Sequence, residues 1–246
     1  MQKANFSLKR LFIYSSIAIL LTGFLTACDK DLDDDNTPVP SAGLMVFNLV
    51  PDREAIGVAL SGNAIGNAPL EFTSFNGAYQ RIFIGARDIE TFDFRTDSLL
   101  AKTNFSFEDS SFYSVFVVGS NGKYNNITVE DEVDSNATAD RAYIRYINAI
   151  PDSSAPVVTI EAGGNNVADG PAAFGEVTEF TPVNGGDVTI AVSNGSSISA
   201  NRTISLENGK AYTALLVGLT DATYTTQKVQ IRYIENGTVG NPTAEK

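Results

Sequence analysis

The chain has 246 residues, with 17 Lys or Arg against 29 Asp or Glu, which gives a formal net charge of −12. Because the sequence contains no His, Ser-His-Asp and Cys-His nucleophile arrangements and His-ligated zinc sites are excluded. A surface this acidic repels phosphate groups, so nucleic acid is not an expected partner.

Residues 1–27 have the pattern of a secretion signal. Lys3, Lys9 and Arg10 form a basic start, and residues 11–24 form an uncharged, apolar run. As a helix, this run would be about 21 Å long, which is too short for a hydrocarbon core of about 30 Å. We therefore expect a signal peptide that is cleaved rather than a permanent transmembrane helix.

The single cysteine of the chain, Cys28, directly follows this segment. It ends the string Leu25-Thr-Ala-Cys28, which resembles the bacterial lipobox Leu-x-Ala/Gly-Cys. The resemblance implies that the thiol takes a diacylglyceryl group and that cleavage makes Cys28 the new N-terminus. The alternative is an ordinary signal peptide followed by a chance or structural cysteine. Since two acyl chains are enough for stable anchoring, we expect a membrane attachment through the lipid on Cys28.

An acidic segment follows the cysteine. Like charges and the prolines after them resist compaction, so residues 28–43 are expected to be a disordered tether. The segment also resembles surface lipoproteins of the Bacteroidetes, in which acidic residues after the cysteine direct export to the cell exterior. A plain solvated spacer is the alternative. The residues of this possible export signal are Asp29, Asp31, Asp33, Asp34 and Asp35.

The remaining sequence contains an internal repeat. The string Asn48-Leu-Val-Pro-Asp52 recurs as Asn148-Ala-Ile-Pro-Asp152, and Tyr113-Ser-Val-Phe-Val-Val-Gly119 recurs as Tyr212-Thr-Ala-Leu-Leu-Val-Gly218. Matched blocks in the same order indicate a duplication. The expected parts are a first repeat at 44–133, a linker at 134–140, a second repeat at 141–235 and a C-terminal tail at 236–246.

Within each repeat, apolar residues occupy every second position. Val158 and Ile160 alternate with polar residues, as do Val188 and Ile190, and Gly-containing turn pairs such as Asn194-Gly195 separate these runs. A period of two buries one face of a strand and leaves the other in water. Short strands at this spacing predict an all-β protein with two tandem Ig-like antiparallel β-sandwich domains. A barrel also fits the pattern.

Two further features predict local structure. Proline followed by aspartate, as in Pro151-Asp152, stops strand pairing and supplies a side chain that makes a turn two residues on. Tyr113 and Tyr212 each begin a nearly continuous apolar run. We expect both tyrosines to be buried with their hydroxyls capping a neighbouring turn, with a ligand contact as the alternative. The runs themselves are expected to lie in the middle of a sheet.

The second repeat resembles a known family. Asn148-Ala-Ile-Pro-Asp-Ser-Ser-Ala-Pro156 and Leu206-Glu-Asn-Gly-Lys-Ala-Tyr-Thr213 are similar to a tandem bacterial family of secreted β-sandwich domains of unknown function, whose typical opening is V-H-A-S-P-D-A-P. The resemblance implies a fold and export but no activity. Asn48 and Asn148 stand where that family often has histidine, so no role of that histidine is carried over.

Carboxylates gather where the first repeat meets the linker, at Glu130, Asp131, Glu132 and Asp134. Hard cations favour six to eight oxygen ligands, so calcium binding at this junction is one reading. A solvated hinge without a metal is the commoner outcome, and we expect no metal here.

Ser98 lies in the string Asp97-Ser98-Leu99. The string resembles the Asp-Ser/Thr-aliphatic site that Bacteroidetes use for O-glycosylation of exported proteins. Turn chemistry explains these three residues equally well.

No motif selects a pair of catalytic carboxylates, so we expect neither an enzyme nor a cofactor. The expected function is a non-catalytic, lipid-anchored protein of the outer membrane that faces the cell exterior. It would bind or scaffold a protein partner, or mediate adhesion, through its sandwich loops. The alternative is a glycan-binding accessory lipoprotein of an uptake system. Phe72, Phe75 and Tyr79 would favour glycan binding if exposed, and the protein partner if packed in the core.

Overall fold

The computed structural model describes residues 38–66, 68–133, 137–152 and 154–239. Cys28, the five aspartates after it and Asp134 lie outside these ranges. Within them, no helix combines the length and the apolar character needed to cross a bilayer.

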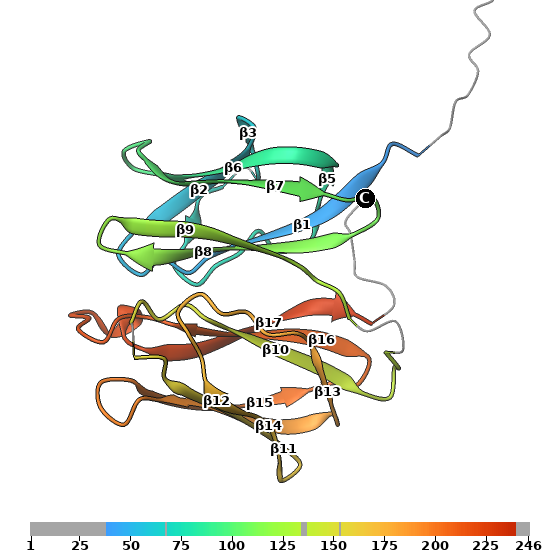
Figure 1. The fold of residues 1–246 in the computed structure, drawn as a ribbon, viewed down its shortest axis with the longest axis vertical. Helices are drawn as coiled ribbons and strands as arrows, with labels where there is room; N and C mark the ends of the chain where they lie inside the picture. Colours follow the sequence, from blue (N-terminus) through green and yellow to red (C-terminus); the bar gives the residue numbers. More distant parts are fainter. Residues whose placement is uncertain (1–37, 67, 134–136, 153, 240–246) are drawn as a thin grey trace, which may run out of the picture. The chain divides into compact units, whose positions relative to one another are not determined.

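The described residues from Pro40 to Val239 belong to one compact unit. Its described part is built from strands, and the one helical element there is the short 3-10 helix η2 (Thr225–Gln227). Four sheets are arranged as two sandwiches that follow each other along the chain (Figure 1). This confirms the predicted all-β fold with two tandem sandwiches.

The first sandwich contains nine strands. One sheet has the order β5-β1-β8-β9, and the other has the order β3-β2-β6-β7 with β4 also paired to β2. The strands are β1 (Ser41–Asn48), β2 (Ala55–Leu60), β3 (Asn63–Ala64), β4 (Leu70–Glu71), β5 (Gln80–Phe83), β6 (Gly85–Asp93), β7 (Leu99–Phe107), β8 (Phe112–Ser120) and β9 (Lys123–Glu130).

The second sandwich repeats this plan with eight strands. Its sheets have the orders β13-β10-β16-β17 and β12-β11-β14-β15. The strands are β10 (Ala142–Asn148), β11 (Val157–Ala162), β12 (Asn165–Pro171), β13 (Thr181–Val183), β14 (Gly186–Ser193), β15 (Ser199–Leu206), β16 (Lys210–Val217) and β17 (Gln230–Thr238).

Each sandwich contains one parallel strand pair, which the antiparallel prediction did not include. β1 pairs with β8 in parallel, and β10 pairs with β16 in the same way. Parallel neighbours need a long crossover between them. The chain provides it, because it passes through the opposite sheet before it returns to the first one.

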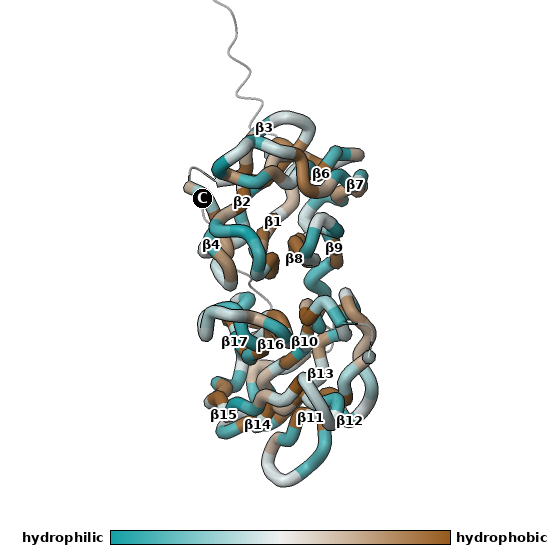
Figure 2. Tube along the Cα trace, turned by 90° about the vertical axis from the view of Figure 1, so that its left-hand side faces the viewer, coloured by the Kyte–Doolittle hydropathy of each residue, from teal (hydrophilic) through white to brown (hydrophobic). Residues whose placement is uncertain are grey.

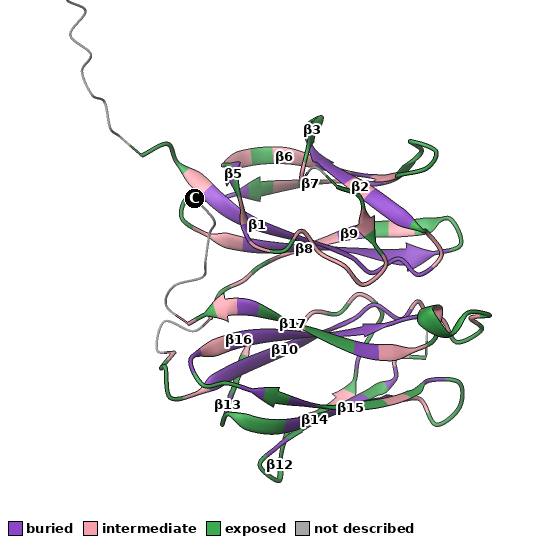
Figure 3. Ribbon diagram, turned by 180° about the vertical axis from the view of Figure 1, so that it is seen from behind, coloured by how far each residue is buried: buried purple, intermediate pink, exposed green. Residues whose placement is uncertain are grey.

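The central strands of these sheets are buried on both faces, as predicted for the apolar runs. Leu44 and Val46 of β1 point into the core of the first sandwich. Met45 and Phe47 point the other way, into a separate apolar cluster that includes Ile147 of the second sandwich. Successive side chains of a strand face opposite sides, so a strand covered on both sides has an almost continuous apolar sequence. β8 and β16 follow the same rule (Figures 2 and 3).

The outer strands instead follow the period of two. In β14, buried Val188, Ile190 and Val192 alternate with residues that are exposed or half-buried. Their apolar side chains form the core of the second sandwich with residues such as Ile160. Alternation therefore identifies the sheet β12-β11-β14-β15, which has one face in the core of its sandwich and the other in water.

The prediction for the two tyrosines is confirmed. The Tyr113 hydroxyl accepts a hydrogen bond from the backbone N–H of Glu108 at 3.1 Å. The Tyr212 hydroxyl accepts one from the backbone N–H of Glu207 at the same distance. Both rings are buried, so each tyrosine fastens the preceding turn to the sandwich core.

The two Pro-Asp turns differ from each other. Asp152 accepts a hydrogen bond from the backbone N–H of Ser154 at 2.7 Å, as predicted for a turn made by its own side chain. Asp52 instead accepts hydrogen bonds from the Asn121 backbone and the Tyr124 hydroxyl. For Asp52 the prediction is therefore wrong, because its carboxylate binds the backbone of the β8–β9 turn and the Tyr124 hydroxyl of β9 instead.

Asn48 and Asn148 end their strands in the same way. Each side-chain oxygen accepts a hydrogen bond from the backbone N–H two residues on, in Val50 and Ile150. The Asn48 amide donates to the backbone carbonyl of Leu70 in β4, and the Asn148 amide donates to that of Ala172, which directly follows β12. Both residues are fully buried, so their role in this chain is to fix the end of the first strand.

Candidate functional site

An apolar cluster lies at the junction between the two sandwiches. It is made by the outward faces of β1 and β8 in the first repeat and of β10 and β16 in the second. Phe47 stacks on Phe116 with ring centroids 4.8 Å apart. The buried members are Met45, Phe47, Leu49, Tyr79, Phe116, Val118, Ile147, Ala149, Leu215 and Val217.

A polar network is buried beside this cluster. Arg145 of β10 forms a salt bridge with Asp131, which directly follows β9, and each side chain is 2% exposed. Asp131 also accepts hydrogen bonds from the Tyr79 hydroxyl at 2.5 Å and from the Ser114 hydroxyl at 2.6 Å. A buried charge needs this degree of compensation, because its hydration is lost on folding.

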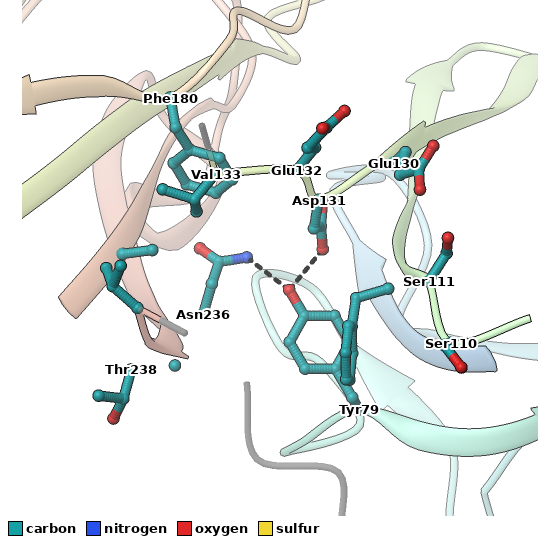
Figure 4. Close-up of a pocket in the computed structure, with 14 residues that line it drawn as sticks. Tyr79, Ser110, Ser111, Glu130, Asp131, Glu132, Val133, Phe180, Asn236 and Thr238 are labelled. Atoms are coloured by element: carbon teal, nitrogen blue, oxygen red, sulfur yellow. Dashed lines mark hydrogen bonds between the residues drawn. The ribbon is translucent and has the colours of Figure 1, made fainter. Parts of the chain in front are cut away.

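The network closes into a ring through the second sandwich. Arg145 Nε donates to the Thr213 hydroxyl at 3.0 Å, and that hydroxyl donates to the Asn236 side-chain oxygen at 2.6 Å. The Asn236 amide donates to the Tyr79 hydroxyl at 3.4 Å, and Tyr79 donates to Asp131 (Figure 4). Residues from both repeats are therefore linked by one chain of donors that starts and ends at the ion pair.

The surroundings of Arg145 and Tyr79 affect the position of the first side chain and the protonation of the second. The Arg145 guanidinium lies 4.3 Å from the ring centroid of Phe180, which places a cation over an aromatic face. Burial raises the pKa of the Tyr79 hydroxyl, and the negative charge of Asp131 and the hydrogen bond to it raise this pKa further. Tyr79 therefore stays protonated and acts as a donor to Asp131.

A cavity of about 320 Å³ adjoins the network (Figure 4). Its walls combine aromatic rings and hydroxyls from both repeats with carboxylates from the first repeat. Tyr79 and Phe180 belong to its lining, as do the serines Ser110 and Ser111. The size is at the lower end of small-molecule pockets.

The predicted acidic cluster is divided by the fold. Asp131 turns inward to Arg145, whereas Glu130 and Glu132 are exposed, and Asp134 lies outside the described residues. In the part of the chain that the structure describes, no three His, Cys, Asp or Glu side chains gather at one place where they could hold a metal ion. The expectation that no metal binds at these residues stays a prediction, with calcium binding as its alternative.

Phe72, Phe75 and Tyr79, whose exposure distinguishes a glycan ligand from a protein partner, all lie inward. Tyr79 is 2% exposed and belongs to the junction cluster. Phe72 and Phe75 are half-buried and pack against that cluster, and Phe75 stacks on Phe47 at 5.4 Å. These three rings do not form an exposed platform.

Two of the exposed apolar side chains lie together at the β6–β7 hairpin tip, residues 93–99. Phe94 and Leu99 are each 54% exposed there. Asp93 fixes the turn, because its side-chain oxygen accepts hydrogen bonds from the backbone N–H groups of Arg95 and Thr96. Ser98, the predicted glycosylation residue, is exposed in the same turn. The tip thus presents two apolar side chains on a fixed backbone.

The corresponding β14–β15 tip of the second sandwich is different. Asn194 fixes this turn by accepting hydrogen bonds from the backbone N–H groups of Ser196 and Ile198. Its apolar residue, Ile198, is fully buried, and the residues that face water are polar. In both repeats the side chain of an Asp or Asn accepts backbone hydrogen bonds and fixes the turn. Only the tip of the first repeat exposes apolar side chains.

Arg145 and Asn236 were not among the functional residues expected from the sequence. A signal for Arg145 was present, because it is a lone charge within the apolar strand Ala142-Tyr-Ile-Arg-Tyr-Ile-Asn148. Asn236 had been assigned to the tail, whereas β17 continues to Thr238. An Arg or an Asn in the sequence does not by itself predict a hydrogen-bond network that links two domains, so the tertiary structure is needed to find it.

The comparisons with known proteins give a family and weak structural likenesses. The family described as "Domain of unknown function (DUF4397)" matches residues 42–155 and again residues 142–246. This confirms the predicted tandem of a family of unknown function. No curated protein matches the chain.

Among solved structures, a family 26 carbohydrate-binding module of Amy13K from Eubacterium rectale, solved with maltoheptaose, is 9% identical, with a TM-score of 0.24, and covers 84% of this chain and 98% of its own. Two provisionally named cell adhesion proteins are also similar. The one from Bacteroides uniformis is 10% identical, with a TM-score of 0.24 and coverage of 79% and 96%. The one from Bacteroides eggerthii is 11% identical, with a TM-score of 0.25 and coverage of 83% and 98%. At TM-scores this low, the likenesses carry no inference about ligand or activity.

Proposed function

The chain belongs to the DUF4397 family, and on that premise we propose that it is a non-catalytic, lipid-anchored protein of a bacterial outer membrane. In this proposal, Cys28 carries the lipid, the acidic tether directs the protein to the cell exterior, and the two sandwiches present a binding surface to a protein partner. The role is adhesion or the scaffolding of an envelope complex.

The observation that carries the binding role is the β6–β7 hairpin tip. Phe94 and Leu99 stay exposed on a turn that Asp93 holds in place. Side chains on a turn that is already ordered lose less conformational entropy on binding than side chains on a mobile loop. A few buried anchor side chains contribute most of the binding energy at protein interfaces, and aromatic residues are enriched at interface cores.

The three aromatic rings that the sequence offered for glycan binding, those of Phe72, Phe75 and Tyr79, favour a protein partner by their position. Flat sugar rings are bound by exposed aromatic faces, and Tyr79, Phe72 and Phe75 are used inside the junction instead. The glycan alternative therefore has to rest on exposed rings elsewhere, such as those of Phe83, Phe94, Phe174 and Tyr224.

The binding role is tested by capture from membranes. The lipid-anchored protein is compared with Phe94→Ser/Leu99→Ser, and Phe83→Ser is the matched control, because Phe83 is 69% exposed on a different sheet. We expect the tip variant to lose a defined set of captured envelope proteins and the control to keep it. Equal capture by all three proteins, or glycan-array binding that the tip variant retains, would refute the proposed role of the tip.

The anchor and the export signal are tested separately. Mass spectrometry of the native protein should find acyl chains on Cys28, and Cys28→Ser should leave the membrane fraction. Replacing the aspartates at 29, 31, 33, 34 and 35 by Asn should keep the protein in the membrane but protect it from protease added to whole cells.

The proposed O-glycosylation is tested at Ser98. This residue is exposed and therefore accessible for modification, and Ser98→Ala removes the hydroxyl that would carry the glycan. The variant should therefore lack any glycan mass found on the native protein.

A further inference from the structure

The junction is built from equivalent positions of the two repeats. Met45 of β1 lies opposite Ser114 of β8 in the strand register. Arg145 of β10 lies opposite Thr213 of β16 in the same way. The duplicated sheets thus present the same patch of the fold to each other.

The equivalence extends to other residues of the buried polar network and its surroundings. Tyr79 precedes Gln80, which pairs with Leu44, and Phe180 precedes Thr181, which pairs with Ile144. These register pairs make Tyr79 and Phe180 equivalent.

Asp131 and Asn236 correspond in a similar way. Asp131 follows Glu130, the register partner of Tyr113, and Asn236 follows Glu235, the register partner of Tyr212. An interface that uses one patch twice has the arrangement of a symmetric dimer.

The charges break this symmetry at two positions. The first repeat has Met45 and Asp131, whereas the second has Arg145 and Asn236. Two first-repeat patches facing each other would bury two aspartates without a cation. Two second-repeat patches would bury two arginines without an anion. A buried charge without its partner is strongly destabilising, so the mixed pairing alone satisfies both charges.

We propose that the Arg145–Asp131 pair determines which sandwiches associate. The junction surface of each repeat fits one partner, the opposite repeat, and rejects a second copy of itself, whether the two repeats belong to one chain or to neighbouring chains. Specificity arises from the cost of the wrong pairing as much as from the gain of the right one. Crowded copies on a membrane would otherwise exchange sandwiches through this shared patch.

The test separates the two repeats after they have folded together. A specific protease site is placed at residues 134–136 of a chain that lacks residues 1–28, and the chain is cut. Native mass spectrometry then counts pairs of first with second repeat and pairs of identical repeats. We expect the unaltered chain to give mixed pairs only. Identical-repeat pairs in comparable amounts, or complete separation of the halves, would overturn the proposal.

Two variants assign the specificity to the ion pair. Asp131→Asn with Arg145→Met gives each repeat the residues found at the equivalent positions of the other, and we expect identical-repeat pairs to rise about tenfold or more, as a loss of about 1.4 kcal/mol of preference gives. Arg145→Lys keeps the charge and should keep mixed pairing. Circular dichroism checks that each variant is folded. Exclusive mixed pairing in the folded double variant would contradict a role of the ion pair.

If the double variant does not fold, the outcome for Arg145→Lys decides. Identical-repeat pairs with Lys at this position would refute a role of the charge itself. Lys102→Met is the matched control, because it removes a cation from an exposed ion pair of the first sandwich. Its pairing should equal that of the unaltered chain, and any change would show that cation removal elsewhere produces the effect.

Discussion

The Arg145 guanidinium and the Asp131 carboxylate form a salt bridge between the two sandwiches in which each side chain is 2% exposed. Their burial makes each charge dependent on the other. The neighbouring hydroxyls and the Asn236 amide satisfy further donors and acceptors around them. The junction is therefore stabilised only when the complete set is present.

Arg145→Met should lower the free energy of unfolding by about 3 to 5 kcal/mol, because it leaves Asp131 buried without a cation. Urea denaturation followed by circular dichroism measures the change. Lys102→Met serves as the control, since its ion pairs with Asp88 and Glu90 are on the surface and should matter little. An equal effect of both substitutions would contradict the importance of burial.

Tyr79 should make the protein less stable at alkaline pH. Burial, and then Asp131, raise the pKa of its hydroxyl above the ordinary value of 10.0. Above about pH 10 the unfolded chain loses this proton while the folded chain keeps it, so the free energy of unfolding falls as the pH rises. Tyr79→Phe has no proton to lose, and its stability should decline less steeply. Urea titrations from about pH 8 to about pH 11 compare the two slopes, and parallel slopes would refute the prediction.

Tyr113→Phe and Tyr212→Phe should each destabilise the protein by about 1 kcal/mol, because each removes the acceptor for one backbone N–H and leaves the ring in place. The two effects should be similar, since the turns are equivalent. Tyr233→Phe is the control, because Tyr233 is 37% exposed and its ring stays under Arg202. Thermal denaturation ranks the three variants, and a control as unstable as the others would count against the turn contacts.

Removal of divalent cations should leave the melting temperature unchanged. Asp131 already accepts hydrogen bonds from Arg145, Tyr79 and Ser114, so it has little capacity left for a metal. Scanning calorimetry with chelator and with added calcium provides the measurement. A higher melting temperature in calcium would instead support a metal site at Glu130 and Glu132.

Several parts of the fold followed from local patterns. Alternation in Val188, Ile190 and Val192 predicted a strand with one wet face, and the structure confirms it. The positions of Tyr113 and Tyr212 before apolar runs predicted the turn contacts. These predictions succeed because strand pleating and short-range turns depend on residues near each other in the chain.

Other parts needed the tertiary structure. Phe75 and Tyr79 had two readings, and only the packing of the two sandwiches shows that they lie inward. Asp131 belonged to an acidic run in the sequence, yet its cation lies 14 residues away on the other repeat. A run of like charges does not reveal which member will be buried.

By itself, the sequence determined that this is a duplicated, strand-built and acidic chain, because a period of two and a repeated set of turns are properties of neighbouring residues. Only the tertiary structure decided that Met45 and Arg145 occupy the same place on two facing sheets, and that one charge there meets its counterion. Burial of a charge depends on what covers it, and that covering comes from residues distant in the chain.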